Sequence, residues 1–139
     1  MDIIETGKVL AKIQAFDNRN VEPETTLAWH EVLEPHSLAD ALTAVSDYFR
    51  VNSSWIMPAH IVERVRAMED ARTYEFKDGY HLNRADEERM LEDRNWSWSE
   101  QMKALSRAVR TGKLTPAAYE AYQSSEQPLE AFMTRKAIQ

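Results

Sequence analysis

Histidines come first in a search for chemistry, because imidazole binds metals and transfers protons near neutral pH. The chain has four. His30 and Glu31 are adjacent in one predicted helix and His36 follows it, but this spacing is not the His-Glu-x-x-His pattern that places two ligands on one helix face. His60 falls in the first turn of a later helix, and His81 has no evident partner. The pattern predicts capping or surface roles for these histidines and no metal site.

Acidic side chains are concentrated between residues 84 and 94, in a segment predicted to be helical. Arginines at 84, 89 and 94 alternate with the acids at spacings that pair opposite charges on one helix. General acid–base catalysis needs carboxylates that are shielded from water, and this segment is the least apolar of the chain. The chain also has no cysteine and no glycine-rich phosphate loop. We therefore expect no catalytic residue, no cofactor and no enzymatic activity.

A basic stripe is the strongest binding signal in the sequence. Lys103, Arg107 and Arg110 recur at i, i+4 and i+7 in a helix predicted to begin after Ser97, so they share one helix face. Such a stripe is typical of a solvated helix near its negatively polarised C-terminal end, and it is also a pattern that contacts phosphates. Trp98, at the start of the same helix, is a residue type that anchors protein interfaces. We predict that Trp98, Lys103, Arg107 and Arg110 bind a partner.

Composition limits the elements that can position these side chains. The chain has 139 residues, 43% of them hydrophobic, with only three Gly and five Pro. This length suffices for a buried core, and so few turn-forming residues favour helices over a many-stranded sheet. The formal charge of −6 is distributed as −5 over residues 1–72, −3 over 73–95 and +2 over 96–139. The uneven charge predicts different partners for the two halves.

Apolar spacing and capping residues predict an all-α fold. Pro23 and Pro58 suit the first positions of the second and fourth helices, and short connections favour an antiparallel four-helix unit at the N-terminus. A charged connector with one charged helix should follow, and then a C-terminal helical element in which Ser97 and Glu100 form a capping box. The predicted domains are residues 1–72, 73–96 and 97–139, and the helices of the first cover residues 3–16, 23–33, 37–50 and 58–72.

The turn Trp55-Ile56-Met57-Pro58 between the third and fourth helices is the most specific structural signal. Apolar residues at helical spacing precede and follow it, and Pro58 disfavours helical geometry at Met57. We interpret Trp55 and Pro58 as a structural elbow that sets how the two helices pack, with Trp55 as a core or hinge anchor. Inward positions in the first two helices are expected at Ile3, Val9, Leu10, Ile13, Phe16, Trp29, Val32 and Leu33.

One arrangement of residues in the first half of the chain has a known parallel. It consists of Phe16 at the end of the first helix, Trp29 and Leu33 in the second, Leu38, Ala41, Ala44 and Tyr48 in the third, and Trp55, Pro58, Ile61 and Arg64 around the elbow. This order resembles the small helical proteins with which phages load and inhibit the hexameric replicative helicase. The resemblance implies a non-enzymatic adaptor that binds the helicase and, as a second partner, an origin-binding protein during replication initiation.

The resemblance covers residues 1–72, and the second half departs from it. In such proteins the folded N-terminal unit precedes a C-terminal part that is flexible or binds the helicase. Residues 97–138 of this chain are capped and amphipathic, so they predict a folded helical element.

Other functions stay open from the residues alone. A small helical DNA-binding regulator would use the stripe from Lys103 to Arg110 for phosphate contacts, although the net acidity favours only a weak contact with DNA. An enzyme has only scattered carboxylates and histidines in its favour. Aromatic residues in the second half also leave a homodimer open. The sequence has no apolar run of membrane-spanning length and no signal-peptide pattern, so we expect a cytoplasmic protein without membrane contact.

Overall fold

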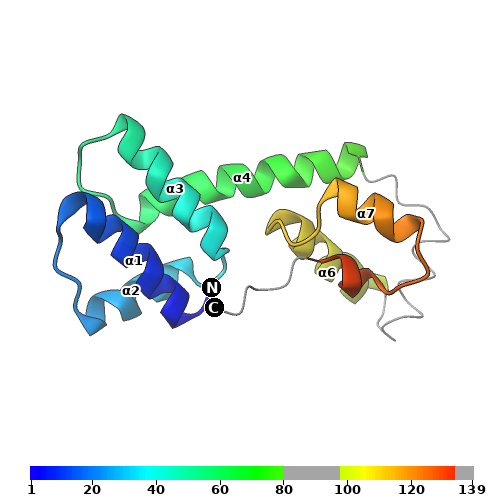
Figure 1. The fold of residues 1–139 in the computed structure, drawn as a ribbon, viewed down its shortest axis with the longest axis horizontal. Coiled ribbons are helices and arrows are strands. Elements are labelled where there is room, and N and C mark those ends of the chain that lie inside the picture. Colours follow the sequence, from blue (N-terminus) through cyan, green and yellow to red (C-terminus); the bar gives the residue numbers. More distant parts are fainter. Residues whose placement is uncertain (80–97, 134–139) are drawn as a thin grey trace. The chain divides into compact units, whose positions relative to one another are not determined.

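The computed structural model describes residues 1–79 and 98–133 (Figure 1). Every regular element in these two ranges is a helix, which confirms the predicted all-α class. None of the described helices is long and apolar enough to cross a membrane. In chain order the elements are α1 (Ile3–Asp17), α2 (Pro23–Leu33), α3 (Leu38–Val51), α4 (Pro58–Gly79), α6 (Trp98–Arg110), α7 (Pro116–Gln123) and the 3₁₀ helix η1 (Leu129–Phe132).

The chain divides into two compact units, Met1–Met68 and Glu69–Gln139, and α4 runs across the division. The domain boundaries predicted after residues 72 and 96 stay a prediction. The charged helix predicted for residues 84–94 lies outside the described residues, and so does His81.

Local capping signals determine where the first helices begin. Asp2 and Glu5 form a reciprocal capping box at the start of α1, in which Asp2 Oδ1 accepts a hydrogen bond from the Glu5 N–H at 2.8 Å. Ser37 Oγ accepts from the N–H of Asp40 at 3.2 Å and so caps α3. Pro23 is the first residue of α2, as expected. Because these signals are short-range, the predicted bounds of α1, α2 and α3 agree with the structure to within one residue.

The core of the first unit lies among α1, α2, α3 and the first turns of α4. Helix α1 packs against both α2 and α3 (Figure 1). Burial of apolar side chains from all four helices is the main stabilising term of this unit. The core residues are Val9, Leu10, Ile13, Trp29, Leu33, Ala41, Ala44, Val45, Tyr48, Ile56, Ile61 and Val65.

Three side chains that we expected to face inward are exposed. The exposed fractions of Ile3, Phe16 and Val32 are 41%, 55% and 44%. Trp29 occupies the buried face of α2, and Val32 lies beside that face instead of on it. Phe16 is in the last turn of α1, where its ring stacks on Phe49 with 4.8 Å between the centroids. Helical spacing locates an apolar stripe but not its edges, which is why these three assignments were wrong.

Helix α4 is longer than predicted, because it continues past residue 72 to Gly79. The segment after Thr73 has no apolar periodicity, so the sequence predicts a connector there. A helix continues wherever its backbone bonds form and its residues tolerate helical geometry, and an apolar face is not required. Thr73 adds a hydrogen bond from its hydroxyl to the Glu69 carbonyl at 2.9 Å. A polar helix of this kind gives no signal in a hydrophobic pattern.

The second unit has its own core, formed by α6, α7 and η1. Helix α6 ends at Arg110, and Gly112 follows in the left-handed region with a φ of 77°. The guanidinium of Arg72 donates to the Arg110 carbonyl at 2.9 Å, which places a positive charge at the negative end of α6. The buried residues of this core are Leu105, Ala108, Val109, Leu114, Tyr119, Tyr122 and Leu129.

Candidate partner-binding surfaces

The elbow does not have the core arrangement predicted for it. Trp55 is 57% exposed, so the core alternative for this residue is wrong, and the hinge alternative stays a prediction. Ile56 is fully buried instead, and Met57 on its other side is again exposed. Neighbouring side chains in an extended segment point to opposite sides, so only one of these residues enters the core. Pro58 is the first residue of α4 and ends the segment.

Arg19 holds Trp55 in place although the indole is exposed. The Arg19 side chain is only 5% exposed, and its Nη2 lies 2.6 Å from Asp17 Oδ2. Nη2 also donates to the carbonyl oxygen of Ile56 at 2.9 Å. The guanidinium carbon lies 4.1 Å from the centroid of the Trp55 ring and 5.6 Å from that of Trp29. Arg19 therefore connects the loop after α1 to the loop after α3.

The role of Arg19 has no recognisable signal in the sequence around it. Nothing in its local sequence shows that two tryptophans and a distant carbonyl surround it, since Ile56 is 37 positions away. The only available signal is the Asp17–Arg19 spacing, and it does not distinguish a buried pair from an exposed one.

Two further hydrogen bonds stabilise the elbow, one from α3 and one from α4. The Tyr48 hydroxyl donates to the Ser54 carbonyl at 3.1 Å, and the N–H of Met57 donates to His60 Nδ1 at 2.9 Å. The imidazole thus acts as a cap at the start of α4. Its ring lies 4.9 Å from the Tyr48 ring. His60 has the structural role that was expected of it.

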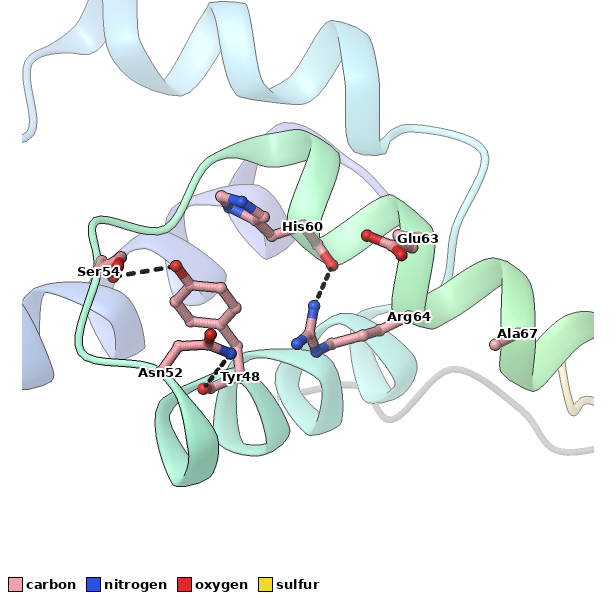
Figure 2. A pocket seen from close by; sticks show the side chains of 7 residues that line it. All are labelled: Tyr48, Asn52, Ser54, His60, Glu63, Arg64 and Ala67. Atoms are coloured by element: carbon pink, nitrogen blue, oxygen red, sulfur yellow. Dashed lines mark hydrogen bonds between the residues drawn. The ribbon is translucent and has the colours of Figure 1, made fainter.

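A shallow recess opens beside this cap, with a volume of about 530 Å³. Figure 2 shows that Tyr48 and Arg64 face each other across it, and the Arg64 guanidinium lies 5.0 Å from the Tyr48 ring centroid. Arg64 Nη1 donates to the His60 carbonyl at 3.2 Å. The lining has one carboxylate, Glu63, and one imidazole whose Nδ1 already accepts a hydrogen bond. Glycosidases, for example, use two carboxylates that act together on one bond, and this lining has only Glu63.

The basic stripe forms a surface on α6, which we call the α6 basic face and define as Lys103, Ser106, Arg107 and Arg110. All four residues are exposed and line one hollow of about 390 Å³. The structure thus brings together three of the four predicted partner-binding residues. The fourth, Trp98, is the first residue of α6, and its side chain lies outside the described part of the molecule.

The cations of the α6 basic face differ in their surroundings. The guanidinium of Arg110 lies 4.0 Å from the carboxylate of Glu69, which is buried. Among the side chains that the structure describes, neither Lys103 nor Arg107 has an ion-pair partner. All three cations line the hollow, and Arg110 is the one of them that lies close to a described carboxylate.

Comparisons with family models, with curated proteins and with solved structures found no match for this chain. Metal binding has no support in the described residues either, because they contain no group of three His, Cys, Asp or Glu side chains that could hold an ion. Both hollows are shallow, whereas small-molecule ligands are usually enclosed in apolar pockets. The candidate binding surfaces are therefore the elbow and the α6 basic face.

Proposed function

We propose that this chain is a non-enzymatic adaptor that binds a hexameric replicative helicase during the initiation of phage or prophage DNA replication. The observation that carries the proposal is Trp55, an exposed indole fixed by a buried guanidinium. A large aromatic side chain facing water gains free energy when a partner covers it, and tryptophan is enriched among the residues that dominate binding energies.

Three further apolar side chains, at the ends of α1 and α3 and in the elbow itself, are exposed like Trp55. We call these four residues, Phe16, Val51, Trp55 and Met57, the elbow surface. Their exposed fractions are 55%, 77%, 57% and 49%. The end of α1 and the loop after α3 lie on the same side of the first unit, where Arg19 joins them through the Ile56 carbonyl (Figure 1). Clusters of exposed apolar side chains are typical of surfaces that bind other proteins.

Fixing the indole before binding lowers the cost of forming a complex. A free side chain loses conformational entropy when a partner immobilises it, at about 0.5–1.5 kcal/mol for each side chain. The contact with Arg19 restricts the Trp55 ring in the absence of any partner. An adaptor needs no catalytic residue: it changes the helicase ring by binding one of its states, closed or open, more tightly than the other.

The test is binding of the full chain to the purified replicative helicase of the host, measured by size-exclusion chromatography with light scattering and by titration. The variant Trp55→Ala should weaken binding by about 2 kcal/mol, or about thirty-fold in Kd. Tyr74→Ala is the matched control, because Tyr74 is an aromatic residue that is 71% exposed on α4. It should bind like the wild-type chain.

A second variant separates the elbow surface from the surface predicted from sequence. Lys103→Gln with Arg107→Gln removes two cations from the α6 basic face and leaves the elbow surface unchanged. Helicase binding that is lost in this variant and kept in Trp55→Ala would assign the contact to α6. Absence of binding by the wild-type chain would refute the adaptor proposal itself.

A further inference from the structure

We propose that the α6 basic face binds the phosphodiester backbone of a nucleic acid. This inference goes beyond the proposed contact with a helicase and does not depend on it. It starts from the positions of the cations, since α6 fixes Lys103, Arg107 and Arg110 on one face beside one hollow. At 1.5 Å per residue, the first and last of them are about 10 Å apart along the helix axis.

This spacing matches a strand of nucleic acid. Phosphates of one strand follow one another at about 3.4 Å of axis in a duplex, so the face spans about three of them. The other side of α6 is fixed, because Leu105, Ala108 and Val109 are buried in the core of the second unit. The cations are therefore held in a row on a packed helix, and a ligand does not have to order the backbone that carries them.

The composition of the hollow favours phosphate over an acidic protein. Among the side chains that the structure describes, its lining is one lysine, two arginines and one serine. Lys, Arg and Ser side chains are common donors to phosphate oxygens. A protein interface usually has an apolar centre inside a polar rim, and this face offers no such centre.

The net charge of −6 does not exclude such a site. At physiological ionic strength, interactions between exposed charges are screened over about 8 Å, so a strand on α6 responds chiefly to nearby charges. Lys103 and Arg107 have no ion pair in the part of the chain that the structure describes, and Lys113, just past the end of α6, is also exposed. Arg110 lies 4.0 Å from Glu69, which orients it at the edge of the hollow.

The test uses the full chain without helicase and a fluorescent single-stranded DNA of 20 nucleotides, or the corresponding duplex, in anisotropy titrations at several salt concentrations. Three phosphate contacts predict that single-strand affinity falls about twenty-fold between 50 and 200 mM salt. In the variant Lys103→Gln with Arg107→Gln the fall should shrink to about three-fold, because one cation remains. Thermal melting checks that the variant is folded.

The matched control is Arg50→Gln with Arg66→Gln. It removes the same charge from exposed positions on α3 and α4 and leaves α6 unchanged. This variant should keep the wild-type salt dependence. Equal weakening in both double variants would refute the site, since the effect would then come from net charge.

Two competitors distinguish the source of the negative charge. Polyglutamate that displaces DNA at equal total charge would overturn the assignment to nucleic acid in favour of an acidic protein. If inorganic phosphate displaces DNA at an equal phosphate concentration, the site binds one isolated anion and not a strand of linked phosphates. That result would also overturn the proposal. DNA binding that is absent, or that is independent of salt, would refute it directly, whatever the outcome with helicase.

Discussion

Arg19 in the first unit and Arg107 in the second show opposite uses of the same side chain. Arg19 is buried, paired with Asp17 and bonded to the Ile56 carbonyl. Arg107 is exposed, and no carboxylate whose side chain the structure describes pairs with it. The first arginine fixes a loop, and the second is available to a ligand. Burial or exposure decides which of these roles an arginine has. The residue type alone does not show whether the side chain is buried.

The largest expected effect comes from removing the buried arginine. Arg19→Ala leaves the Asp17 carboxylate without its partner in a site where its side chain is only 13% exposed. Breaking a buried ion pair on one side typically costs about 3–5 kcal/mol, and we expect that loss in the free energy of unfolding of the first unit. Denaturant unfolding, followed by hydrogen exchange in peptides from residues 1–68, measures it.

The control for Arg19→Ala is another arginine of the same unit. Arg50 pairs with Asp47 at 3.0 Å, but the two side chains are 75% and 41% exposed. Arg50→Ala should therefore change stability by less than about 1 kcal/mol. Similar losses for the two variants would mean that Arg19 does not hold the elbow. The contrast between a structural Arg19 and a ligand-binding Arg107 would then fail.

The next effect distinguishes two neighbouring residues of the elbow. Ile56 is fully buried, so Ile56→Ala should lower the free energy of unfolding by about 2–5 kcal/mol. Trp55 is 57% exposed and loses mainly its contact with Arg19, so Trp55→Ala should cost only about 1 kcal/mol. Melting temperatures of the two variants decide this. A larger loss for Trp55→Ala would restore the core role that the sequence suggested.

Two glycines should respond in opposite directions. Gly112 has a φ of 77°, and an added Cβ would lie 3.3 Å from Cζ of Arg72, so Gly112→Ala should destabilise the second unit by about 1–2 kcal/mol. Gly7 is inside α1 with no atom within 4 Å of an added Cβ, so Gly7→Ala should stabilise the first unit by about 0.5–1 kcal/mol. Hydrogen exchange resolved by peptide assigns each change to its unit, and a stabilised Gly112→Ala would contradict the left-handed cap.

The helices of the first unit were predictable because their signals are local. Pro23, the Ser37 cap and the apolar spacing of α1 each act within a few residues. The end of α4 was missed because a solvated helix needs no apolar face. The direction of the Trp55 side chain was missed because it depends on Arg19, which is 36 positions away in sequence and comes close only in the folded chain. For the α6 basic face the sequence predicted exposure correctly, since a stripe of cations opposite an apolar face has few other places to lie.

The smallest effect on stability is expected from replacing the cations of the α6 basic face. It is the counterpart of the large effect expected from Arg19→Ala. Lys103 and Arg107 are exposed and lack ion pairs within the described ranges, so replacing both by glutamine should change the free energy of unfolding by less than about 0.5 kcal/mol. Thermal and denaturant unfolding of this double variant, beside Arg19→Ala, give the measurement. A loss above 1 kcal/mol would show that the two cations stabilise the second unit, and they would then belong with Arg19 as structural residues. A stable variant with weaker DNA binding would place their role in the ligand contact alone.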